Sequence, residues 1–554
     1  MAERGHRSSN RRAIGRALPF LALISSPLVL GAAPLAAPRY DVVIRGGRVL
    51  DGAGNPWVLA DVAVKDGRIA KIGQVSGHGR EEIDAHGRYV APGFIDMMDH
   101  SGYTLRKDGR ADNKLLMGVT SVIDGEGGTP VEAAKIPEYF AQLEKQKIAV
   151  NLGTYYGSHQ ARIKVVGDSA ARASPAQIAA EQAEVATAMR AGAFGIGTAL
   201  IYPPASFQTT DELIAMAKVV ARCQGFYASH MRDESSDVLK AIDEAVRIGE
   251  ESGAKVEIFH LKAAYQPLAG KLMPQIVARI AAARERGVDL AADMYPYTAG
   301  GTGLDATIPS HIFADGEEKG WARLRDPKVR EALKREVASG RRPDWSNLVD
   351  ASGGWSHVVL ANAHNPQYDR FNGKDFETIG KELGRDPADA AWDIALAALP
   401  KRAMGLYFMM DDNDIRLALR QPWTSIGTDA AAATLGGVDG LGLPHPRSWG
   451  TFPRILGHYV RDTHDLTLPE AVRKMTSWPA TRMGLADRGL VREGLRADIV
   501  VFDADKIADR STYKDPSAPP AGVGDVLVNG VTELRDGHVT GARAGMVLRH
   551  TCAA

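Results

Sequence analysis

Residues 226–260 read FYASHMRDESSDVLKAIDEAVRIGEESGAKVEIFH, and this stretch indicates the fold class most clearly. Two short apolar runs, Phe226–His230 and Val256–His260, flank a segment of helical length at Ser235–Ser252. A strand, a helix and a second strand of this kind form a βαβ unit, in which the two strands run parallel in one sheet. Each predicted strand ends in a histidine, so we expect both imidazoles at the same edge of the sheet.

The same unit recurs through residues 93–485. Eight runs are predicted to be strands: Phe94–Asp96, Ser121–Asp124, Val150–Thr154, Phe194–Thr198, Phe226–His230, Val256–His260, Leu290–Tyr295 and Thr424–Asp429. Further helices are predicted at Pro175–Ala191 and Pro274–Arg286. Eight alternating units predict an α/β fold, the (β/α)₈ TIM barrel.

The predicted seventh and eighth strands are separated by a long insertion at about 299–422. It has helix candidates of its own at Pro327–Ser339 and Pro387–Leu396. We expect the insertion to cover the mouth of the barrel.

Both ends of the ordered chain read as short strands with tight turns, over residues 38–92 and 486–550. Asp66-Gly67 is a hairpin turn signal after the alternating run Asp61–Val64, and Ala497–Phe502 is a strand near the other end. Strands from opposite ends of a chain can pair with one another. We therefore predict one small β-sandwich domain built from both ends.

Residues 1–37 have the pattern of a secretory signal peptide. Four arginines precede the apolar stretch Ala17–Leu30: Arg7, Arg11, Arg12 and Arg16. Small residues follow it, and the prolines Pro27 and Pro34 disfavour the alternative of an uncleaved membrane anchor. No later stretch is long and apolar enough to span a bilayer. The sequence thus predicts an exported protein, periplasmic or secreted, without stable membrane insertion after signal removal.

Composition and charge are those of an ordinary globular protein. Hydrophobic residues make up 45% and charged residues 24%, and 67 basic residues balance 67 acidic ones. A neutral chain offers no reason to expect nucleic acid as a partner, so a small-molecule substrate is predicted. The two cysteines, Cys223 and Cys552, make no disulfide framework. The sequence leaves oligomerisation open.

Polar side chains stand where the predicted strands end. They are Glu126, His230, His260 and Asp429. Barrel enzymes place catalytic groups at the C-terminal ends of their strands, and two imidazoles with carboxylates suit zinc. Each residue alone has a structural reading, as a packing histidine, a solvated loop residue or a helix cap. Together they predict a zinc site, with Asp429 also the general base.

Several longer motifs resemble those of a known protein family. They are Ala91-Pro92-Gly93-Phe94-Ile95-Asp96, Gly118-Val119-Thr120-Ser121, Ile201-Tyr202-Pro203-Pro204, Ser229-His230-Met231-Arg232-Asp233-Glu234, Met294-Tyr295-Pro296-Tyr297-Thr298-Ala299, Gly427-Thr428-Asp429 and His445-Pro446-Arg447-Ser448-Trp449-Gly450-Thr451-Phe452-Pro453-Arg454. Across residues 40–550 the chain resembles the amidohydrolase superfamily and, within it, the D-aminoacylase (N-acyl-D-amino-acid deacylase) family.

The resemblance implies a zinc-dependent hydrolase acting on carbon–nitrogen bonds other than peptide bonds, with N-acyl-D-amino acids or related small amides as substrates. Lys262 is then the first candidate to bind the substrate carboxylate, and Arg232 and Arg447 are the others. Tyr202 would donate a hydrogen bond to the oxyanion. No role is assigned to His159 and Arg162, which lie after the third predicted strand.

Two positions depart from the family pattern. Met98 stands where the family has the first histidine of a His-x-His motif, and Gly127 stands where it has a cysteine ligand. A thioether is a poor zinc ligand among nitrogen and oxygen donors. The chain thus resembles a divergent branch in which Glu126 replaces the cysteine, with one zinc ion per chain and His100 as a further candidate ligand.

Two other functions remain open at the level of sequence. One is cyclic-amide or lactone hydrolysis, for which relatives use a modified lysine after the fourth strand, where this chain has Ala199-Leu200-Ile201-Tyr202. The other is a metal-free binding protein, which Met98 and Gly127 favour and the retained histidines disfavour.

Overall fold

The structure is a computed structural model that describes residues 39–340, 345–438 and 440–552. The predicted signal peptide, residues 1–37, lies outside the described residues. Within those residues, every helix is too short or too polar to cross a membrane.

The predicted α/β class is confirmed by a set of parallel strands. Hydrogen bonds order them as β6-β7-β8 and as β9-β10-β11-β12-β13-β17. Their bounds are β6 (Phe94–Asp99), β7 (Val119–Asp124), β8 (Asn151–Thr154), β9 (Tyr156–Gly157), β10 (Gly195–Ala199), β11 (Phe226–His230), β12 (Lys255–Ile258), β13 (Leu290–Met294) and β17 (Thr424–Ile426).

The two parallel sheets meet at both of their edges. The amide of Phe194 donates to the carbonyl of Thr154, which links β10 to the end of β8. On the other side, Asp99 at the end of β6 forms a parallel bridge with Ala430 just beyond β17. Strand ends that are far apart in the sequence therefore lie beside one another.

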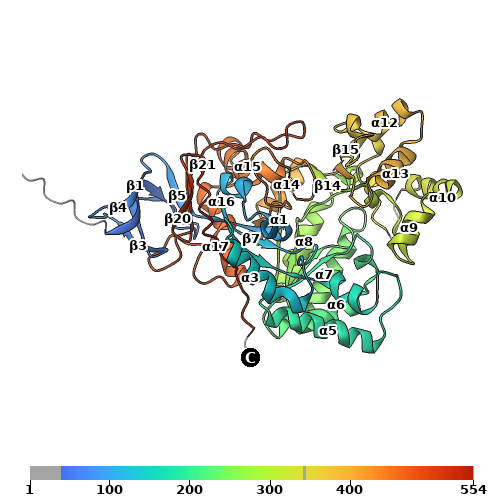
Figure 1. The fold of residues 1–554 in the computed structure, drawn as a ribbon, viewed down its shortest axis with the longest axis horizontal. Helices are drawn as coiled ribbons and strands as arrows, with labels where there is room; N and C mark the ends of the chain where they lie inside the picture. The colour runs from blue at the N-terminus through green and yellow to red at the C-terminus, as the bar shows by residue number, and fades with distance from the viewer. Residues whose placement is uncertain (1–38, 341–344, 439, 553–554) are drawn as a thin grey trace, which may run out of the picture. The chain divides into compact units, whose positions relative to one another are not determined.

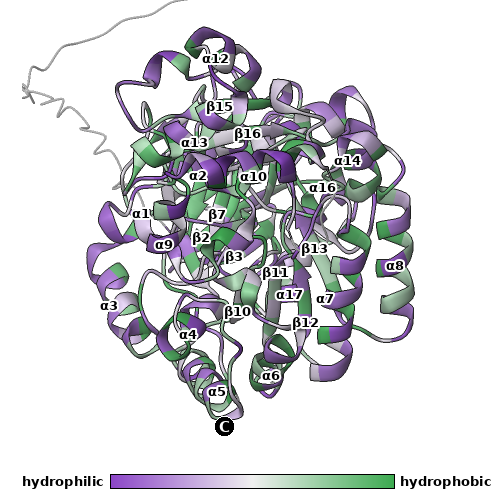
Figure 2. Ribbon diagram, turned by 90° about the vertical axis from the view of Figure 1, so that its right-hand side faces the viewer, coloured by the Kyte–Doolittle hydropathy of each residue, from purple (hydrophilic) through white to green (hydrophobic). Residues whose placement is uncertain are grey.

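Helices surround these strands with one apolar side inward. In α7 (Val238–Ser252) the buried residues recur at helical spacing, from Val238 through Ile242 and Ala245 to Gly249. Helix α7 ends at Gly253, which has the left-handed conformation that glycine adopts without penalty. In Figure 2 such helices combine green and purple segments around the green central strands. The others on this layer include α3 (Ile136–Gln146), α4 (Ser158–Val165), α5 (Pro175–Arg190), α6 (Thr210–Ala221) and α8 (Met273–Glu285).

The insertion between β13 and β17 has its own sheet and its own core. Strands β14 (Ala299–Gly303), β16 (Met404–Phe408) and β15 (Val358–Asn362) pair antiparallel in that order. Its apolar residues, among them Trp392 and Phe376, form a separate buried cluster. Figure 1 shows its helices grouped together: α9 (Glu317–Arg323), α10 (Pro327–Ala338), α12 (Phe376–Leu383) and α13 (Pro387–Ala398).

The predicted C-terminal limit of the insertion, residue 422, is too late. Helix α14 (Asp412–Leu419) buries Ile415, Ala418 and Leu419 in the same core cluster as the parallel strands. The last residue in the insertion's own core is Met409. Helix α14 therefore belongs to the strand–helix layer, because its apolar face packs there.

Strands from both ends of the chain pair in one small domain, and Figure 1 shows them side by side. Hydrogen bonds connect nine strands there into one sheet, and their packing as a β-sandwich stays a prediction. The sheet stays continuous because β1 is ten residues long and pairs with β4 along its first half and with β5 along its second. The strands are β1 (Tyr40–Val49), β2 (Val58–Lys65), β3 (Arg68–Gly73), β4 (Gly79–Asp84), β5 (Tyr89–Pro92), β18 (Ile499–Phe502), β19 (Val523–Val528), β20 (Val531–Arg535) and β21 (His538–Val539).

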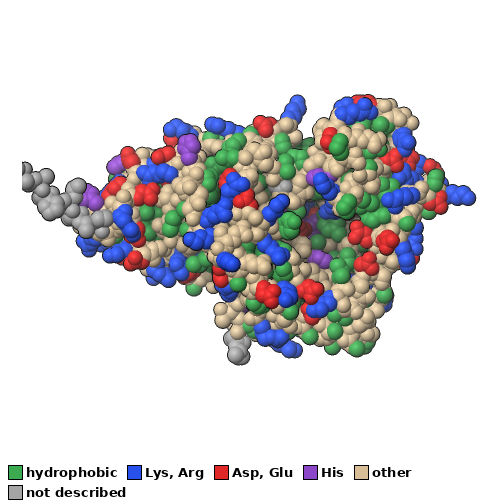
Figure 3. Space-filling model, viewed as in Figure 1, with side chains coloured by type: hydrophobic (Ala, Val, Ile, Leu, Met, Phe, Trp, Pro, Cys, Tyr) green, Lys and Arg blue, Asp and Glu red, His purple; other side chains and the backbone are tan. Residues whose placement is uncertain are grey.

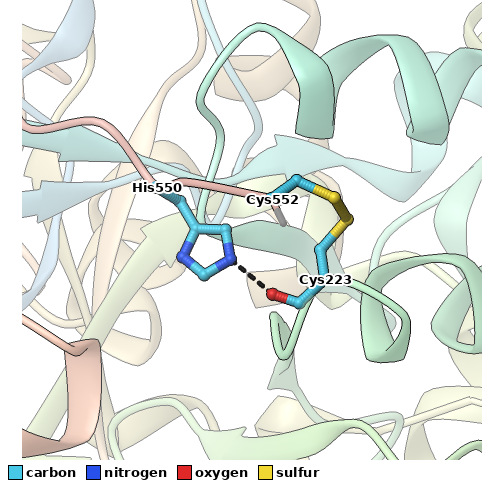
Figure 4. The surroundings of a disulfide bond; sticks show 3 residues. All are labelled: Cys223, His550 and Cys552. Carbon is cyan, nitrogen blue, oxygen red and sulfur yellow. Dashed lines mark hydrogen bonds between the residues drawn. A yellow bond between two sulfur atoms is a disulfide. The ribbon is translucent and has the colours of Figure 1, made fainter. Parts of the chain in front are cut away.

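The C-terminal tail is tied back to the parallel strands. Leu548 donates its amide to Leu152 of β8, and the His550 ring contacts the carbonyl of Cys223 at 2.7 Å. A disulfide joins Cys223 to Cys552, a pairing that the sequence analysis did not predict (Figure 4). The bond anchors the tail next to the N-terminal end of β11.

Candidate metal centre and active site

Five predicted site residues meet at the C-terminal ends of the parallel strands. His230 ends β11 and His260 follows β12, while Glu126 follows β7 and Asp429 follows β17. His100 comes directly after β6. All five line one cavity of about 440 Å³, a volume in the range of small-molecule sites. Figure 3 shows a hollow on the surface with histidine side chains visible in it.

The carboxylate of Glu126 is the centre of a first group of donors. Its Oε1 atom lies 2.5 Å from His230 Nδ1 and 3.2 Å from His260 Nε2. The two rings are nearly perpendicular, with centroids 4.5 Å apart. All three side chains are buried, and their ligand atoms lie within 4.8 Å of one another.

This arrangement fits a zinc ion. Burial alone would raise the pKa of Glu126, but contacts with His100, His230 and His260 lower that pKa well below its ordinary value. An ionised carboxylate and imidazole lone pairs face each other only with a proton or a cation between them. Two imidazoles and one carboxylate are a frequent zinc ligand set that leaves room for a fourth ligand. The chemistry of this donor set thus suits zinc.

A second group of donors shares Glu126. His100 Nε2 lies 3.1 Å from Glu126 Oε2 and 3.0 Å from Asp429 Oδ1. These three residues also offer ligand atoms within 4.8 Å of one another. The structure thus brings His100 into the site.

Two of these residues have strained backbones. His260 has φ of +35° and Asp429 has φ of +50°, in the left-handed region that residues other than glycine seldom adopt. Hydrogen bonds donated by their backbone amides hold them there, from His260 to Asp293 Oδ1 at 2.8 Å and from Asp429 to the Met98 carbonyl at 2.9 Å. Strain of this kind concentrates at functional sites, where the surrounding structure compensates its cost.

Lys262 lies beside the first group of donors. Its Nζ donates to both oxygens of Glu234, at 2.8 and 2.9 Å, and lies 2.6 Å from His260 Nδ1. Glu234 also lies 3.0 Å from that nitrogen. Because Lys262 and Glu234 contact Nδ1 of His260, its Nε2 atom faces Glu126. Lys262 and Glu234 therefore orient the imidazole.

Arg447 lies beside the second group. Its Nη1 contacts Asp429 Oδ2 at 2.6 Å, and its guanidinium stands 4.8 Å from the Tyr295 ring centroid. His445 positions it, because the Arg447 amide donates to His445 Nδ1 at 3.0 Å while His445 Nε2 donates to the Ala299 carbonyl. Burial lowers the pKa of His445 well below its ordinary value, which keeps the ring neutral.

The other predicted residues divide between the cavity and its surroundings. Tyr202 lines the cavity with its ring 5.4 Å from that of His230. Arg232 does not, because its guanidinium pairs with Glu244 and donates to the carbonyls of Ser206 and Gln208. The structure therefore places Arg232 in the wall of a neighbouring cavity of about 490 Å³ and not in that of the cavity with the metal donors.

The two positions that depart from the family pattern have different surroundings. Met98 is fully buried in an apolar cluster with Ile95 and Met97, and its side chain belongs to neither donor group. Gly127 lines the cavity, and a side chain there would meet no atom within 4 Å of its Cβ. Arg162, which had no assigned role, is buried against Glu212 outside the cavity.

Sequence reasoning missed three residues of this cavity region. Glu234 stands four residues after His230, a spacing that gave a weak signal. Arg402 and Asp305 gave none, since both belong to the insertion and reach the cavity region only through its tertiary packing.

Comparisons with known proteins agree with this geometry. Residues 81–532 match the model of the Amidohydrolase family. The chain is 33% identical to the D-aminoacylase of Alcaligenes xylosoxydans xylosoxydans, over 93% of this chain and 98% of that protein.

Two solved structures are similar in fold. One is the N-acyl-D-glutamate deacylase of Bordetella bronchiseptica, solved with zinc and a phosphonate inhibitor (30% identity, TM-score 0.75, 92% of this chain and 99% of that chain). The other is a D-aminoacylase described as having a binuclear metal centre (32% identity, TM-score 0.76, 92% and 100%). The chain therefore belongs to the amidohydrolase family, in the group that contains D-aminoacylase and the N-acyl-D-amino-acid deacylases.

Proposed function

We propose that this protein is a zinc-dependent hydrolase that cleaves the amide bond of N-acyl-D-amino acids. One observation supports this most strongly. Glu126, His230 and His260 offer a zinc ligand set, with Asp429 beside it, in a cavity that also contains Lys262 and Arg447. The site thus combines metal ligands, a carboxylate base and cations for a carboxylate-bearing substrate.

Glu126, His230 and His260 would hold the ion. Zinc at this place supplies a Lewis acid that polarises a carbonyl and lowers the pKa of water. The second group has three donors, but Met98 provides none where the family has a histidine. We therefore infer that a second ion binds there more weakly.

Asp429 is placed to move the proton. Arg447 holds its Oδ2 atom, which fixes the carboxylate and leaves Oδ1 facing the donors. Asp429 takes a proton from the attacking water while the oxygen of that water bonds to the amide carbon. It then gives that proton to the amine nitrogen as the carbon–nitrogen bond breaks. The products are a carboxylic acid and a free D-amino acid.

The remaining cavity residues orient the substrate. Lys262 and Arg447 offer cationic groups for its carboxylate, and Arg447 presents a planar fork that suits such a group. Tyr202 carries a hydroxyl whose pKa is raised by burial, so it stays protonated and can donate to the developing oxyanion.

The direct test measures release of free amine from N-acetyl-D-leucine and N-acetyl-L-leucine by purified zinc-loaded protein. We expect turnover of the D substrate, a strong preference for it over the L form, and none with His230→Ala. Loss of turnover with a chelator and its recovery with zinc would support the metal assignment. An absence of turnover with zinc fully bound would contradict the proposal.

We further propose that the protein is exported and that its parallel strands form a (β/α)₈ barrel. The basic, apolar and small-residue pattern of residues 1–37 supports export, as does the disulfide between Cys223 and Cys552, since such bonds persist in oxidising compartments. The edge contacts of the two parallel sheets support the barrel. Cell fractionation with mass measurement of the mature chain tests export, and an uncut cytosolic product would contradict it.

A further inference from the structure

A second arginine lines the active-site cavity on the side of the insertion. Arg402 comes just before β16, and its Nε and Nη2 atoms donate to the two oxygens of Asp305 at 2.7 and 2.8 Å. The two side chains form a salt bridge, in which Asp305 is the counter-ion of Arg402.

This pair stands close to the metal donors. The Tyr202 ring lies between them, with its centroid 5.4 Å from the His230 ring and 5.0 Å from the Arg402 guanidinium carbon. The Tyr202 hydroxyl is fixed 2.7 Å from Thr302 Oγ1. A substituent extending from a substrate at the donors past Tyr202 would therefore reach Arg402.

The insertion also contributes apolar side chains to the cavity. Leu348, Met404 and Met409 line it, and all three belong to the insertion. The Arg402 side chain keeps 45% of its surface accessible, and it lines both this cavity and a neighbouring one of about 350 Å³. A substituent at this wall would meet carbon atoms and a cation that already has its counter-ion.

Arg402 differs in this respect from Arg447. The counter-ion of Arg447 is Asp429, whose charge a metal ion in the second donor group would share. The counter-ion of Arg402 is Asp305, which belongs to neither candidate metal group. Asp305 therefore stays the counter-ion of Arg402 whichever donor group holds a metal.

We propose that Asp305 and Arg402 form a specificity pair, which makes the insertion's wall accept an uncharged substituent of the substrate and reject a carboxylate. The inference rests on the proposed deacylase function and adds the charge of the preferred substrate to it. Family membership does not fix this property, because the similar solved structures include an N-acyl-D-glutamate deacylase.

The test compares pairs of substrates that differ only in charge. N-acetyl-D-glutamine and N-acetyl-D-glutamate vary the amino-acid side chain, while N-succinamoyl-D-leucine and N-succinyl-D-leucine vary the acyl group. For each pair the ratio of kcat/KM values, uncharged over charged, is measured in the wild type, Asp305→Asn and Arg402→Met. Glu382→Gln is the matched control, since it also removes one carboxylate from an exposed ion pair of the insertion.

We expect the wild type to prefer the uncharged member of at least one pair about tenfold or more. Asp305→Asn frees Arg402 and should reduce that ratio at least tenfold, whereas Arg402→Met leaves Asp305 uncompensated and should increase it. Glu382→Gln should leave it within about twofold. Ratios that stay within twofold of wild type in both pairs and both variants would overturn the inference.

The same design separates this inference from the proposed function. Turnover of N-acetyl-D-leucine tests the function alone. If no substrate turns over, the function is contradicted. Calorimetry then measures the dissociation constants of the four ligands, and the ratio of these constants within each pair tests the charge preference. If Asp305→Asn does not fold, the opposite shift expected for Arg402→Met still tests the pair.

Discussion

Strand β11 (Phe226–His230) is held differently at its two ends. At the C-terminal end, His230 lies among buried ionisable groups with Glu126 and His260, near a strained backbone at Asp429. At the N-terminal end, a disulfide at Cys223 and a contact between the His550 ring and the Cys223 carbonyl attach the C-terminal tail. One end is therefore arranged for chemistry at a cost in stability, and the other end stabilises the chain.

We therefore expect that changes to the metal donors at the C-terminal end of β11 alter activity much more than stability. Changes to the tail attachment at its N-terminal end should alter stability much more than activity. Buried charges that serve a metal are costly to fold, so their removal need not destabilise the protein. A tail fixed far from the cavity can loosen without moving the donors. Three substitutions test this, and a fourth, Arg232→Ala, tests where Arg232 lies; the expected effects run from the largest to the smallest.

Glu126→Gln should have the largest effect. The carboxylate joins both donor groups, so its loss removes a ligand from each. We expect zinc content to fall to a small fraction of one ion per chain and kcat/KM to fall at least about 10⁴-fold, which corresponds to about 5 kcal/mol. Metal analysis and kinetics measure both, with exposed Glu138→Gln as the control. Full zinc occupancy in the variant would contradict the assignment.

Asp429→Asn should reduce kcat by about 10³-fold, within the range for loss of a general base. The first donor group does not include this residue, so one zinc ion should remain bound. Steady-state kinetics and metal analysis of the same sample separate the two effects. A variant that keeps its kcat would show that another group moves the proton.

Cys552→Ala should lower the free energy of unfolding by about 2 kcal/mol and leave kcat/KM unchanged. The expected loss is moderate because hydrogen bonds from Leu548 and His550 still hold the tail. Thermal unfolding with and without reductant measures it, and reductant should affect only the wild type. A loss of activity at native temperature would contradict the separation of the two ends.

Arg232→Ala should have the smallest effect. Its guanidinium pairs with Glu244 outside the active-site cavity, so we expect KM to change less than about twofold and stability to fall by about 1 kcal/mol. Lys262→Ala provides the contrast, because Lys262 lines the cavity and its loss should raise KM. A large rise in KM for Arg232→Ala would restore this residue to the substrate site.

Much of the fold could be predicted from the sequence, because its pattern is local. Strand β11 begins and ends where the apolar run predicts, and the hairpin at Asp66-Gly67 has positive φ at both residues, as its turn signal requires. Residues that end parallel strands must converge at one edge of a sheet. That rule alone brings His230, His260 and Asp429 together.

The rest depends on tertiary packing that no local pattern encodes. Cys223 and Cys552 are 329 residues apart, and only the path of the tail brings them together. Arg232 lies two residues after His230 but turns toward Glu244, because a loop can point its side chains either way. Arg402 reaches the cavity from an insertion with its own core, whose placement the sequence does not reveal.

The most direct test of the central claim is a crystal structure of zinc-loaded protein with anomalous data collected at the zinc absorption edge. We predict one strong peak about 2.0–2.2 Å from Glu126, His230 Nδ1 and His260 Nε2. A peak elsewhere, or none at full zinc occupancy in solution, would contradict the assembly of these residues around a metal.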